Sequence, residues 1–381
     1  MSSAIRTTHV GSLPRPARLR DALAAGGEPR PELVADAVLE SVQSQLAAGV
    51  DIVNDGEMGR PSYVTYVTDR LTGFGRAEPP PRRRDNGLDD FPEFAASRPP
   101  RRELPVCVGP VSYRGGAAVE RDVATLRAAL GGREGFLTAA SPGVIEMFLA
   151  DLHHGDREDY LSALAAAMKI EYETVVAAGL TLQLDCPDLA CSRTFFEPGA
   201  AGRDAYRRHI ALNLEVLDHA LRDVPPERVR MHVCWGNYAG PHNRDVPLAD
   251  LIDLVLAARP ATVSFEGANP RHGHEWELFE QVGLPAGKTI MPGVVDSTTP
   301  YVEHPRLVAQ RIERYARAVG SGRVLAATDC GLATFAASDQ ALDPRIAYAK
   351  LRSLAEGADI AASRLNPQRV ASGRREHDQY R

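Results

Sequence analysis

Long apolar runs, an excess of basic charge and abundant cysteine are all missing from this sequence of 381 residues. No apolar run reaches the ~18–20 residues that a membrane-spanning helix needs, and the first residues (MSSAIR) lack the apolar stretch of a signal peptide. The 44 Lys and Arg against 50 Asp and Glu give a formal charge of −6, which is unfavourable for contacts with nucleic-acid phosphates. We therefore expect a cytoplasmic protein that binds neither membranes nor nucleic acids.

The few cysteines limit the chemistry further. In a reducing cytoplasm they serve as free thiols or metal ligands rather than as disulfides. They are Cys107, Cys186, Cys191, Cys234 and Cys330. A free cysteine inside a fold is most often a small apolar core residue, and this is our interpretation for Cys107 and Cys191.

Short β-rich patterns alternate with longer helical patterns along the chain. The predicted strands are residues 7–10, 50–54, 104–108, 181–184, 229–233, 262–265, 288–293 and 323–327. The predicted helices include residues 31–48, 162–178, 205–222, 248–258, 305–319 and 344–355. Such alternation predicts a parallel sheet, and eight units predict an α/β fold of the (β/α)₈ TIM-barrel type. A doubly wound open sheet is the alternative, but the glycine-rich phosphate loop that usually marks it is absent.

Two segments depart from this alternation. Residues 75–103 are rich in Pro, Arg and Asp and have no sustained apolar period, so we expect a long loop or flap inserted into the barrel. Residues 367–381 form a polar C-terminal tail. Residues 1–366 are therefore predicted to form a single catalytic barrel.

Chemically active side chains follow seven of the eight predicted strands. A barrel gathers the carboxyl ends of its strands on one face, where active sites are built. The side chains at these ends include His9, Ser12, Arg15, Asp55, Glu57, Asp185, Cys186, His232, Cys234, Asn237, Glu266, Asn269, Asp296, Thr298, Asp329 and Cys330. The alternative interpretation for the carboxylates among them is a barrel-end ion pair or a helix cap.

The pair His232 and Cys234 is the most specific feature of this set. Residues i and i+2 of a strand point to the same side, so both side chains can reach one ion. Cys330 arrives from the last strand and Glu266 from the sixth. Two sulfurs, one imidazole and one carboxylate form a donor set suited to tetrahedral Zn²⁺. Cys186 lies near, but it points the other way in a regular strand.

The motifs together resemble a known family. TTHVGSLPR at residues 7–15, DGE at 55–57, QLD at 183–185, HVC at 232–234 and DCG at 329–331 are similar to the catalytic barrel of cobalamin-independent methionine synthase. The segments HVCWGNYAGP (232–241), 265–274 and 328–335 are similar to a single-barrel branch that includes epoxyalkane:coenzyme M transferases.

The resemblance implies a barrel of the UROD/methionine-synthase type with zinc as cofactor. The zinc ligands it implies are His232, Cys234, Glu266 and Cys330. It implies that Ser12, Glu57 and Asp185 contact the amine or backbone of the thiol substrate. Further substrate-binding candidates at the strand ends are Arg15, Trp235, Asn237, Asp296 and Thr298. The family's proposed proton-donating histidine falls here on Thr298, so the imidazole is missing.

We expect a zinc-dependent thiol S-alkyltransferase in which a zinc-bound substrate thiolate attacks a carbon electrophile. The reaction is expected to be most like that of epoxyalkane:coenzyme M transferase, which forms a 2-hydroxyalkyl thioether. Its partners would be a small thiol and a small alkyl donor, in a protein that can form a homo-oligomer. The catalytic candidates are Glu57, Asp185, Tyr63 and His242. An acidic group on the thiol could be held by Arg6, Arg15, Arg60 or Arg271.

Three other functions remain open. The first is a single-barrel methionine-synthase-type methyltransferase that methylates homocysteine or a related thiol. The second is a metal-free decarboxylase like uroporphyrinogen decarboxylase, which has no need of the cysteine and histidine set. The third is a zinc- or thiol-binding protein without catalysis.

Overall fold

The computed structural model describes residues 5–25, 29–80, 87–98, 103–334 and 342–366. Its main sheet has seven parallel strands in the order β1-β4-β5-β6-β7-β8-β9. The strands are β1 (Val53–Asn54), β4 (Gly135–Ala140), β5 (Thr181–Asp185), β6 (Val229–His232), β7 (Thr262–Phe265), β8 (Thr289–Val295) and β9 (Ala327–Thr328). Almost every strand residue is buried, as expected for a parallel sheet covered on both faces.

The chain around Thr7 closes the sheet into a barrel. The Thr8 amide donates to the Ala326 carbonyl (2.9 Å), and the Ala326 amide donates to the Arg6 carbonyl (2.9 Å). On the other side, the Ile52 amide donates to the Thr7 carbonyl (3.1 Å) just before β1. The segment therefore fills the eighth position between β9 and β1, which confirms the predicted barrel.

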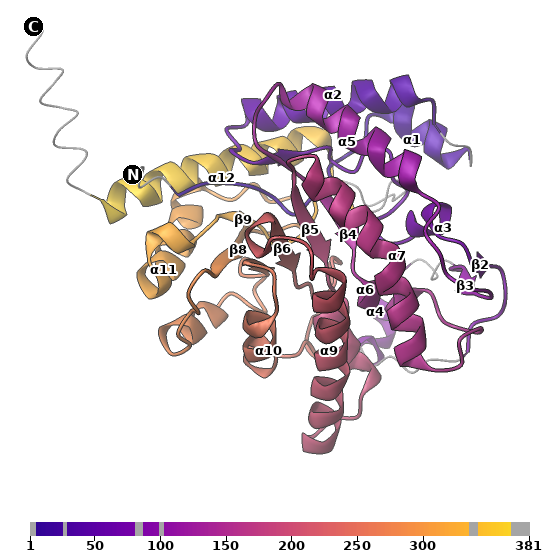
Figure 1. Cartoon of the computed structure of the whole chain (residues 1–381). Helices are drawn as coiled ribbons and strands as arrows, with labels where there is room; N and C mark the ends of the chain where they lie inside the picture. The colour runs from indigo at the N-terminus through magenta and orange to yellow at the C-terminus, as the bar shows by residue number, and fades with distance from the viewer. Residues whose placement is uncertain (1–4, 26–28, 81–86, 99–102, 335–341, 367–381) are drawn as a thin grey trace, which may run out of the picture.

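Helices surround the sheet on its outer face (Figure 1). The α-helices are α1 (Ala17–Ala24), α2 (Pro31–Ala47), α3 (Val67–Arg70), α4 (Pro92–Ala96), α5 (Gly116–Leu130), α6 (Pro142–Phe148), α7 (Arg157–Ala177), α8 (Asp188–Cys191), α9 (Ala200–Ala220), α10 (Ile252–Ala257), α11 (Pro305–Val319) and α12 (Pro344–Leu365). Short 3₁₀ helices are η1 (Leu88–Asp90), η2 (Ser192–Phe195), η3 (Pro226–Arg228), η4 (Leu248–Asp250), η5 (Glu275–Glu280) and η6 (Ser321–Arg323). The predicted bounds of α11 are confirmed, and those of α2 differ by one residue.

The predicted third barrel strand is wrong. Residues 106–107 form β3 (Val106–Cys107), which pairs antiparallel with β2 (Phe74–Gly75) in a separate two-stranded sheet. The third strand of the barrel is instead β4, whose sequence GFLTAA has one β-branched residue, Thr138, and includes glycine and two alanines, which are depleted in strands. Its six residues are all buried, so tertiary burial overrides their weak strand propensity.

The predicted flap lies between β2 and β3. Its described part contains η1 and α4 and packs against the loop that follows β6. Asp90 accepts hydrogen bonds from the side chains of Asn243 (2.8 Å) and Arg244 (Nε, 2.9 Å), and Arg98 donates to the Ala239 carbonyl (2.9 Å). Residues 81–86 and 99–102 of the flap and the predicted tail at 367–381 lie outside the described residues. The division into barrel, flap and tail stays a prediction.

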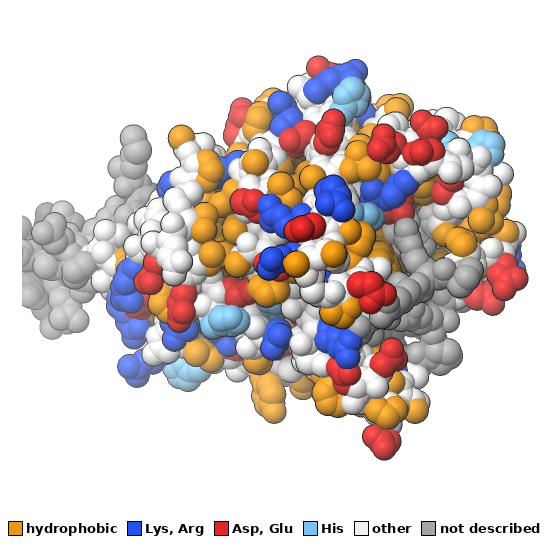
Figure 2. All heavy atoms as spheres, turned by 90° about the horizontal axis from the view of Figure 1, so that it is seen from below, with side chains coloured by type: hydrophobic (Ala, Val, Ile, Leu, Met, Phe, Trp, Pro, Cys, Tyr) orange, Lys and Arg blue, Asp and Glu red, His pale blue; other side chains and the backbone are white. Residues whose placement is uncertain are grey.

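The described surface is mixed in charge. On the face drawn in Figure 2, acidic and basic side chains are interspersed with apolar ones. Within the described residues, no helix is both long and apolar enough to cross a membrane.

A buried ion pair ties α12 to the loop after β8. Lys350 is fully buried, and its Nζ donates to Glu303 Oε2 (3.1 Å) and to the Asp296 carbonyl (2.9 Å). Removing the cation would leave the buried Glu303 carboxylate with only the more distant Arg311 (3.9 Å) as a charge partner. We expect Lys350→Met to lower the free energy of unfolding by about 3–5 kcal/mol, measured by urea denaturation. The exposed Arg352 on the same helix is the matched control: Arg352→Met should change stability by less than about 0.5 kcal/mol. Equal effects of the two substitutions would contradict this role of Lys350.

Candidate metal centre and substrate cavity

Three metal-donor side chains meet at the carboxyl end of the barrel. One ligand atom each of His232, Cys234 and Cys330 lies within 4.8 Å of the others. His232 ends β6, Cys234 lies two residues further on the same side, and Cys330 follows β9. The two sulfurs are 3.8 Å apart, and Glu266 Oε1 lies 3.8 Å from the Cys234 sulfur. The structure thus brings together the four side chains that the sequence predicts as ligands.

The imidazole of His232 is in the protonation state that a metal requires. Burial lowers its pKa to about 3, so the ring is neutral at physiological pH. Nδ1 lies 3.4 Å from the Ser264 hydroxyl, whereas Nε2 is buried and has no hydrogen-bond partner among the described residues. A buried polar atom without a partner is unfavourable unless a ligand satisfies it, and a neutral imidazole nitrogen is a common metal donor.

The Cys234 thiol is shifted towards its protonated form by its surroundings. The neighbouring Cys330 sulfur and burial both raise the pKa of the Cys234 thiol. The Gly236 amide lies 3.2 Å from the Cys234 sulfur and donates to it. A bound divalent cation would favour the thiolate form of Cys234 instead, because a thiol loses its proton when it binds such an ion.

Glu266 is held in place by the two loops beside it. Its Oε1 accepts from the Trp235 amide (3.0 Å), and its Oε2 accepts from the Asn269 side chain (2.8 Å). Asp329, next to Cys330, accepts from the amides of residues 267, 268 and 269 at 2.6–2.8 Å and so fixes the loop that carries Glu266. Burial raises the pKa of Glu266. The donor set of two sulfurs, one imidazole and one carboxylate fits Zn²⁺.

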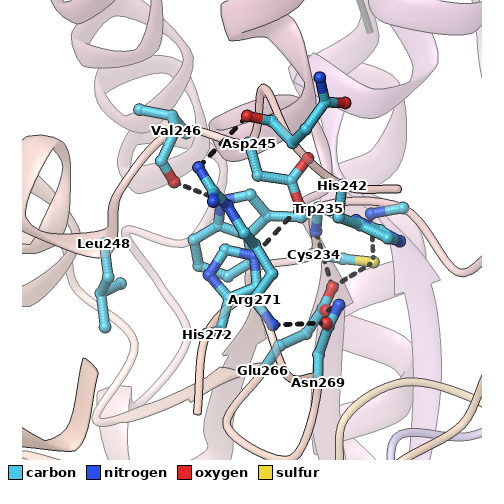
Figure 3. A network of polar contacts seen from close by, with 12 residues as sticks. Cys234, Trp235, His242, Asp245, Val246, Leu248, Glu266, Asn269, Arg271 and His272 are labelled. Carbon is cyan, nitrogen blue, oxygen red and sulfur yellow. Dashed lines mark hydrogen bonds and ion pairs between the residues drawn. The ribbon is translucent and has the colours of Figure 1, made fainter. Parts of the chain in front are cut away.

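A network of polar groups surrounds Trp235 and Glu266 (Figure 3). Asp245 Oδ2 lies 2.6 Å from His242 Nδ1 and 3.1 Å from His272 Nε2, and His272 Nδ1 lies 2.9 Å from Glu275 Oε2. Burial alone would lower the pKa of His272, but Asp245 and Glu275 raise it to about 10, so the ring is cationic. The Trp235 ring packs on His272 with centroids 4.4 Å apart.

A small cavity of about 120 Å³ opens beside the metal-donor side chains. Ser12, Glu57 and Asp185 line it together with His232, Cys234 and Cys330, as expected for residues that contact a thiol substrate. Glu57 Oε1 accepts from the Thr138 hydroxyl (3.1 Å), whereas Oε2 has no hydrogen-bond partner among the described residues. Burial raises the pKa of both Glu57 and Asp185, and repulsion from Glu57 raises that of Asp185 further.

The turn after β1 aims Glu57 at this cavity. Gly56 and Glu57 both have a left-handed backbone, with φ of 66° and 56°. This conformation is uncommon for a residue with a side chain and costs about 1 kcal/mol or more. Such strain is typical of residues whose side-chain direction matters for function.

A second, larger cavity has a volume of about 2530 Å³. Tyr63, Phe148 and Asn237 line both cavities, so the two spaces adjoin. Trp235 and Thr298 line the large cavity, as do Ser97 and Arg98 from the predicted flap. Of the predicted substrate-binding residues, Trp235, Asn237 and Thr298 therefore border this outer space.

Arg15, Asp296 and His242 do not line the small cavity. The Arg15 guanidinium donates to the backbone carbonyls of residues 57, 60 and 333, which makes it a support for the loops. Asp296 accepts from the amide and hydroxyl groups of Thr298 and Thr299 within its own loop. His242 has both ring nitrogens near partners, Asp245 and the Tyr238 carbonyl (3.0 Å).

Asn269 was predicted only as a strand-end side chain, and its role as a holder of Glu266 was not. No sequence pattern points to Asp245, His272 or Glu275. The three-residue spacing of His272 and Glu275 is compatible with a local contact, but the partner Asp245 comes from a different loop. The sequence alone holds no sign of that pairing.

The comparisons with known proteins agree with this geometry. The family described as "Cobalamin-independent synthase, Catalytic domain" matches residues 5–349 of the chain. A protein named methionine synthase from Saccharolobus solfataricus is 26% identical over 369 residues, which cover 94% of this chain and 95% of the relative. A protein named 2-hydroxypropyl-CoM lyase from Xanthobacter autotrophicus is 26% identical over 399 residues, which cover 95% of this chain and 96% of the relative.

A solved structure supports the fold. The B12-independent methionine synthase from Shewanella sp. W3-18-1, in complex with selenomethionine, superposes with a TM-score of 0.74 at 24% identity. The match covers 95% of this chain and 99% of the other. The architecture derived from the hydrogen bonds of the sheet is thus that of a known barrel.

Proposed function

The chain belongs to the family of cobalamin-independent synthase catalytic domains, and from this membership we propose that it is a zinc-dependent enzyme that alkylates the sulfur of a small amino-thiol. The observation that carries the amino-thiol is the pair Glu57 and Asp185, which faces the metal-donor side chains across a small cavity. Methyl transfer to homocysteine or a closely related thiol is the reaction that this pair supports best.

The nucleophile comes from the metal centre. His232, Cys234, Glu266 and Cys330 would hold Zn²⁺, which when bound lowers the pKa of a substrate thiol and so provides a thiolate. Two cysteine thiolates and a carboxylate carry one more negative charge than Zn²⁺ neutralises, so these protein donors leave negative charge on the substrate sulfur. Asn269 and the Trp235 amide would hold the carboxylate of Glu266 when an incoming sulfur competes with it.

Glu57 and Asp185 would bind the ammonium group of the substrate. An ammonium beside Glu57 Oε2 would give this buried oxygen the partner that it lacks among the described residues. The positive charge would also relieve the repulsion between the two carboxylates and favour their ionised forms. The Ser12 hydroxyl lines the same cavity and is available to the acidic group of an amino-acid thiol.

A thiol that carries only an acidic group fits less well. No Lys or Arg is present among the described residues that line the small cavity. Arg15 donates to backbone carbonyls, and Arg60 Nη1 donates to the Thr138 carbonyl and hydroxyl. Arg6 pairs with Glu134, and Arg271 donates to the Asn243 carbonyl. A sulfonate inside the small cavity would therefore meet two carboxylates and no Lys or Arg among the described lining residues.

The two adjoining cavities separate the reactants. The amino-thiol would occupy the small cavity, and the alkyl donor would approach from the large one past Tyr63 and Asn237. The sulfur attacks the carbon of the donor, a C–S bond forms, and the bond to the leaving atom breaks. The predicted flap borders the outer cavity, so its closure would exclude water from the reacting carbon.

Opening of an epoxide by coenzyme M is the second candidate. The observation that favours it is Thr298, which occupies the place where the resemblance implies a proton-donating histidine. Its hydroxyl donates to Asp296 (2.8 Å), so it is not free to replace that acid for a nitrogen leaving group. A metal-free decarboxylation would leave the histidine and cysteine set without a role.

A comparison of matched thiols tests the proposal. Zinc-loaded protein is given homocysteine, its deaminated analogue 4-mercaptobutanoic acid or coenzyme M, each with methylcobalamin, a methylfolate or epoxypropane. Mass spectrometry then measures the thioethers. We expect homocysteine to react at least about tenfold faster than the deaminated analogue, because only homocysteine pairs with the two carboxylates. Faster formation of a hydroxypropyl thioether of coenzyme M would instead establish the second candidate.

A further inference from the structure

A second set of metal-donor side chains lies outside the barrel sheet. One ligand atom each of Cys107, Asp151 and His154 lies within 4.8 Å of the others. Cys107 belongs to β3 of the two-stranded sheet, and the other two residues lie in the loop between α6 and α7. None of the three takes part in the proposed reaction.

The backbone holds Cys107 and Asp151 side by side. The Cys107 amide donates to the Ala150 carbonyl (2.8 Å), and the Leu152 amide donates to the Cys107 carbonyl (2.8 Å). Cys107 and Asp151 are partners in a parallel bridge. Because the donors are fixed by main-chain hydrogen bonds, a cation would not have to order a mobile segment to bind them.

The imidazole of His154 completes the set. Its Nδ1 lies 2.9 Å from Asp151 Oδ1 and 3.8 Å from the Cys107 sulfur. The ring stacks on Tyr160 with centroids 5.3 Å apart and an angle of 30° between the planes. One nitrogen therefore faces a carboxylate oxygen and a sulfur at the same time, although it can share a hydrogen with only one of them.

These distances are close to those around a tetrahedral ion. Zinc bonds of ~2.3 Å to sulfur and ~2.0 Å to nitrogen or oxygen give edges of about 3.5 Å between N and S and about 3.3 Å between N and O. The observed 3.8 Å and 2.9 Å differ from these edges by a few tenths of an ångström, which a small rotation of the partly buried His154 ring would supply.

The charges also suit a divalent cation. Asp151 accepts hydrogen bonds from the amides of residues 153, 154 and 155 at 3.0–3.2 Å, which favours the ionised carboxylate. With the thiolate of Cys107, it would neutralise a divalent cation, while the neutral imidazole adds no charge. Asp151 and Leu152 border the large cavity, where water can occupy a fourth position.

We propose that Cys107, Asp151 and His154 form a second metal site, for Zn²⁺ or a similar thiophilic divalent cation, separate from the cluster of His232, Cys234, Glu266 and Cys330. Binding releases the proton of the Cys107 thiol to solvent, and the sulfur, the carboxylate and Nδ1 of His154 take the ion. The ion would fasten the β2–β3 sheet, from which the predicted flap extends, to the loop that begins α7. The Cys107 thiol donates to the Gly109 carbonyl (3.3 Å), and it would give up this hydrogen bond on binding the ion.

Metal content in matched histidine variants tests this site. His153 is the neighbour of His154, is exposed and lies outside the set. After loading with zinc and desalting, we expect about two equivalents in the unchanged protein and in His153→Ala, but about one in His154→Ala. Circular dichroism verifies that each variant is folded. One equivalent in all three proteins, or two in all three, would overturn the proposal.

Two further measurements separate this site from the first. His232→Ala should retain one equivalent, and adding His154→Ala to it should remove that one. Cobalt spectra count the bound thiolates, and Cys107→Ser should lower the thiolate-to-cobalt absorption by about a third, because three cysteines would bind ions in all. An unchanged spectrum in Cys107→Ser, or a metal-free His232→Ala, would also overturn the second site and leave the proposed function untouched.

Discussion

Replacing His232 by alanine should remove one equivalent of zinc and lower turnover by about a thousandfold or more. The substitution deletes the only imidazole in the donor set, and the substrate thiol would keep its proton at neutral pH without the ion. Loss of the thiolate nucleophile corresponds to about 4 kcal/mol or more in activation free energy. Cys330→Ser should act in the same way, because it removes one of the two sulfurs.

Elemental analysis and thioether formation by the same preparations provide the measurement. Cys186→Ala is the matched control, since Cys186 is buried at the end of the neighbouring strand and its sulfur faces the Leu184 carbonyl (3.6 Å). It should keep both metal and turnover. If His232→Ala retained its zinc and full activity, the ligand assignment would have to be abandoned.

The barrel and the convergence of the four candidate donors are predictable because each depends on local regularities. Alternating strand and helix patterns imply a parallel sheet, and the carboxyl ends of parallel strands converge. The two-residue spacing of His232 and Cys234 places both side chains on the same side at the end of β6. These arguments need no knowledge of which loops touch. The structure brings His232, Cys234 and Cys330 together and places Glu266 3.8 Å from the Cys234 sulfur.

The third strand shows where local patterns fail. Residues 104–108 have the apolar composition of a strand and do contain one, but it pairs with β2 instead of the barrel. The true strand, residues 135–140, is rich in glycine and alanine. Pairing partners are decided by burial between distant segments, and a short sequence window does not contain that information.

Contacts between loops were beyond prediction for the same reason. Asp245 and His272 lie in loops that follow different strands, and their relative positions depend on the closed barrel. Arg15 follows a strand as a substrate-binding residue would, yet its donors face backbone carbonyls. A residue type at a strand end indicates proximity to the site, but the direction of the side chain is set by its neighbours.

The same limit applies to Cys107. Its interpretation as a core residue was based on the usual burial of cysteine, and it is indeed buried. Its sulfur nevertheless lies 3.8 Å from His154, because the β2–β3 sheet packs against the loop before α7. Cys107 and Asp151 are 44 positions apart in the sequence, so no motif spacing could have linked them.

Glu57→Gln should raise the KM for homocysteine by about 10- to 100-fold and change that for 4-mercaptobutanoic acid little. The substitution keeps the shape of the side chain but removes the charge opposite the ammonium group, and a hydrogen bond between charged groups contributes about 1.5–3 kcal/mol. Steady-state kinetics with both thiols and one alkyl donor measure the effect. The deaminated analogue has no ammonium group, so any general damage to the site would appear with both substrates.

Asp188→Asn is the matched control for this substitution. Asp188 is a buried carboxylate three residues beyond Asp185, and it accepts from Ser141 (2.9 Å) and Asn213 (2.8 Å) outside the small cavity. Its amide variant should leave the preference for homocysteine unchanged. Since Glu57 reaches the cavity only through a left-handed backbone, a selective effect on the amino-thiol would explain why that conformation is kept. Equal losses with both thiols would exclude Glu57 as the ammonium partner, and the acceptor would then have to be sought among thiols without an amine.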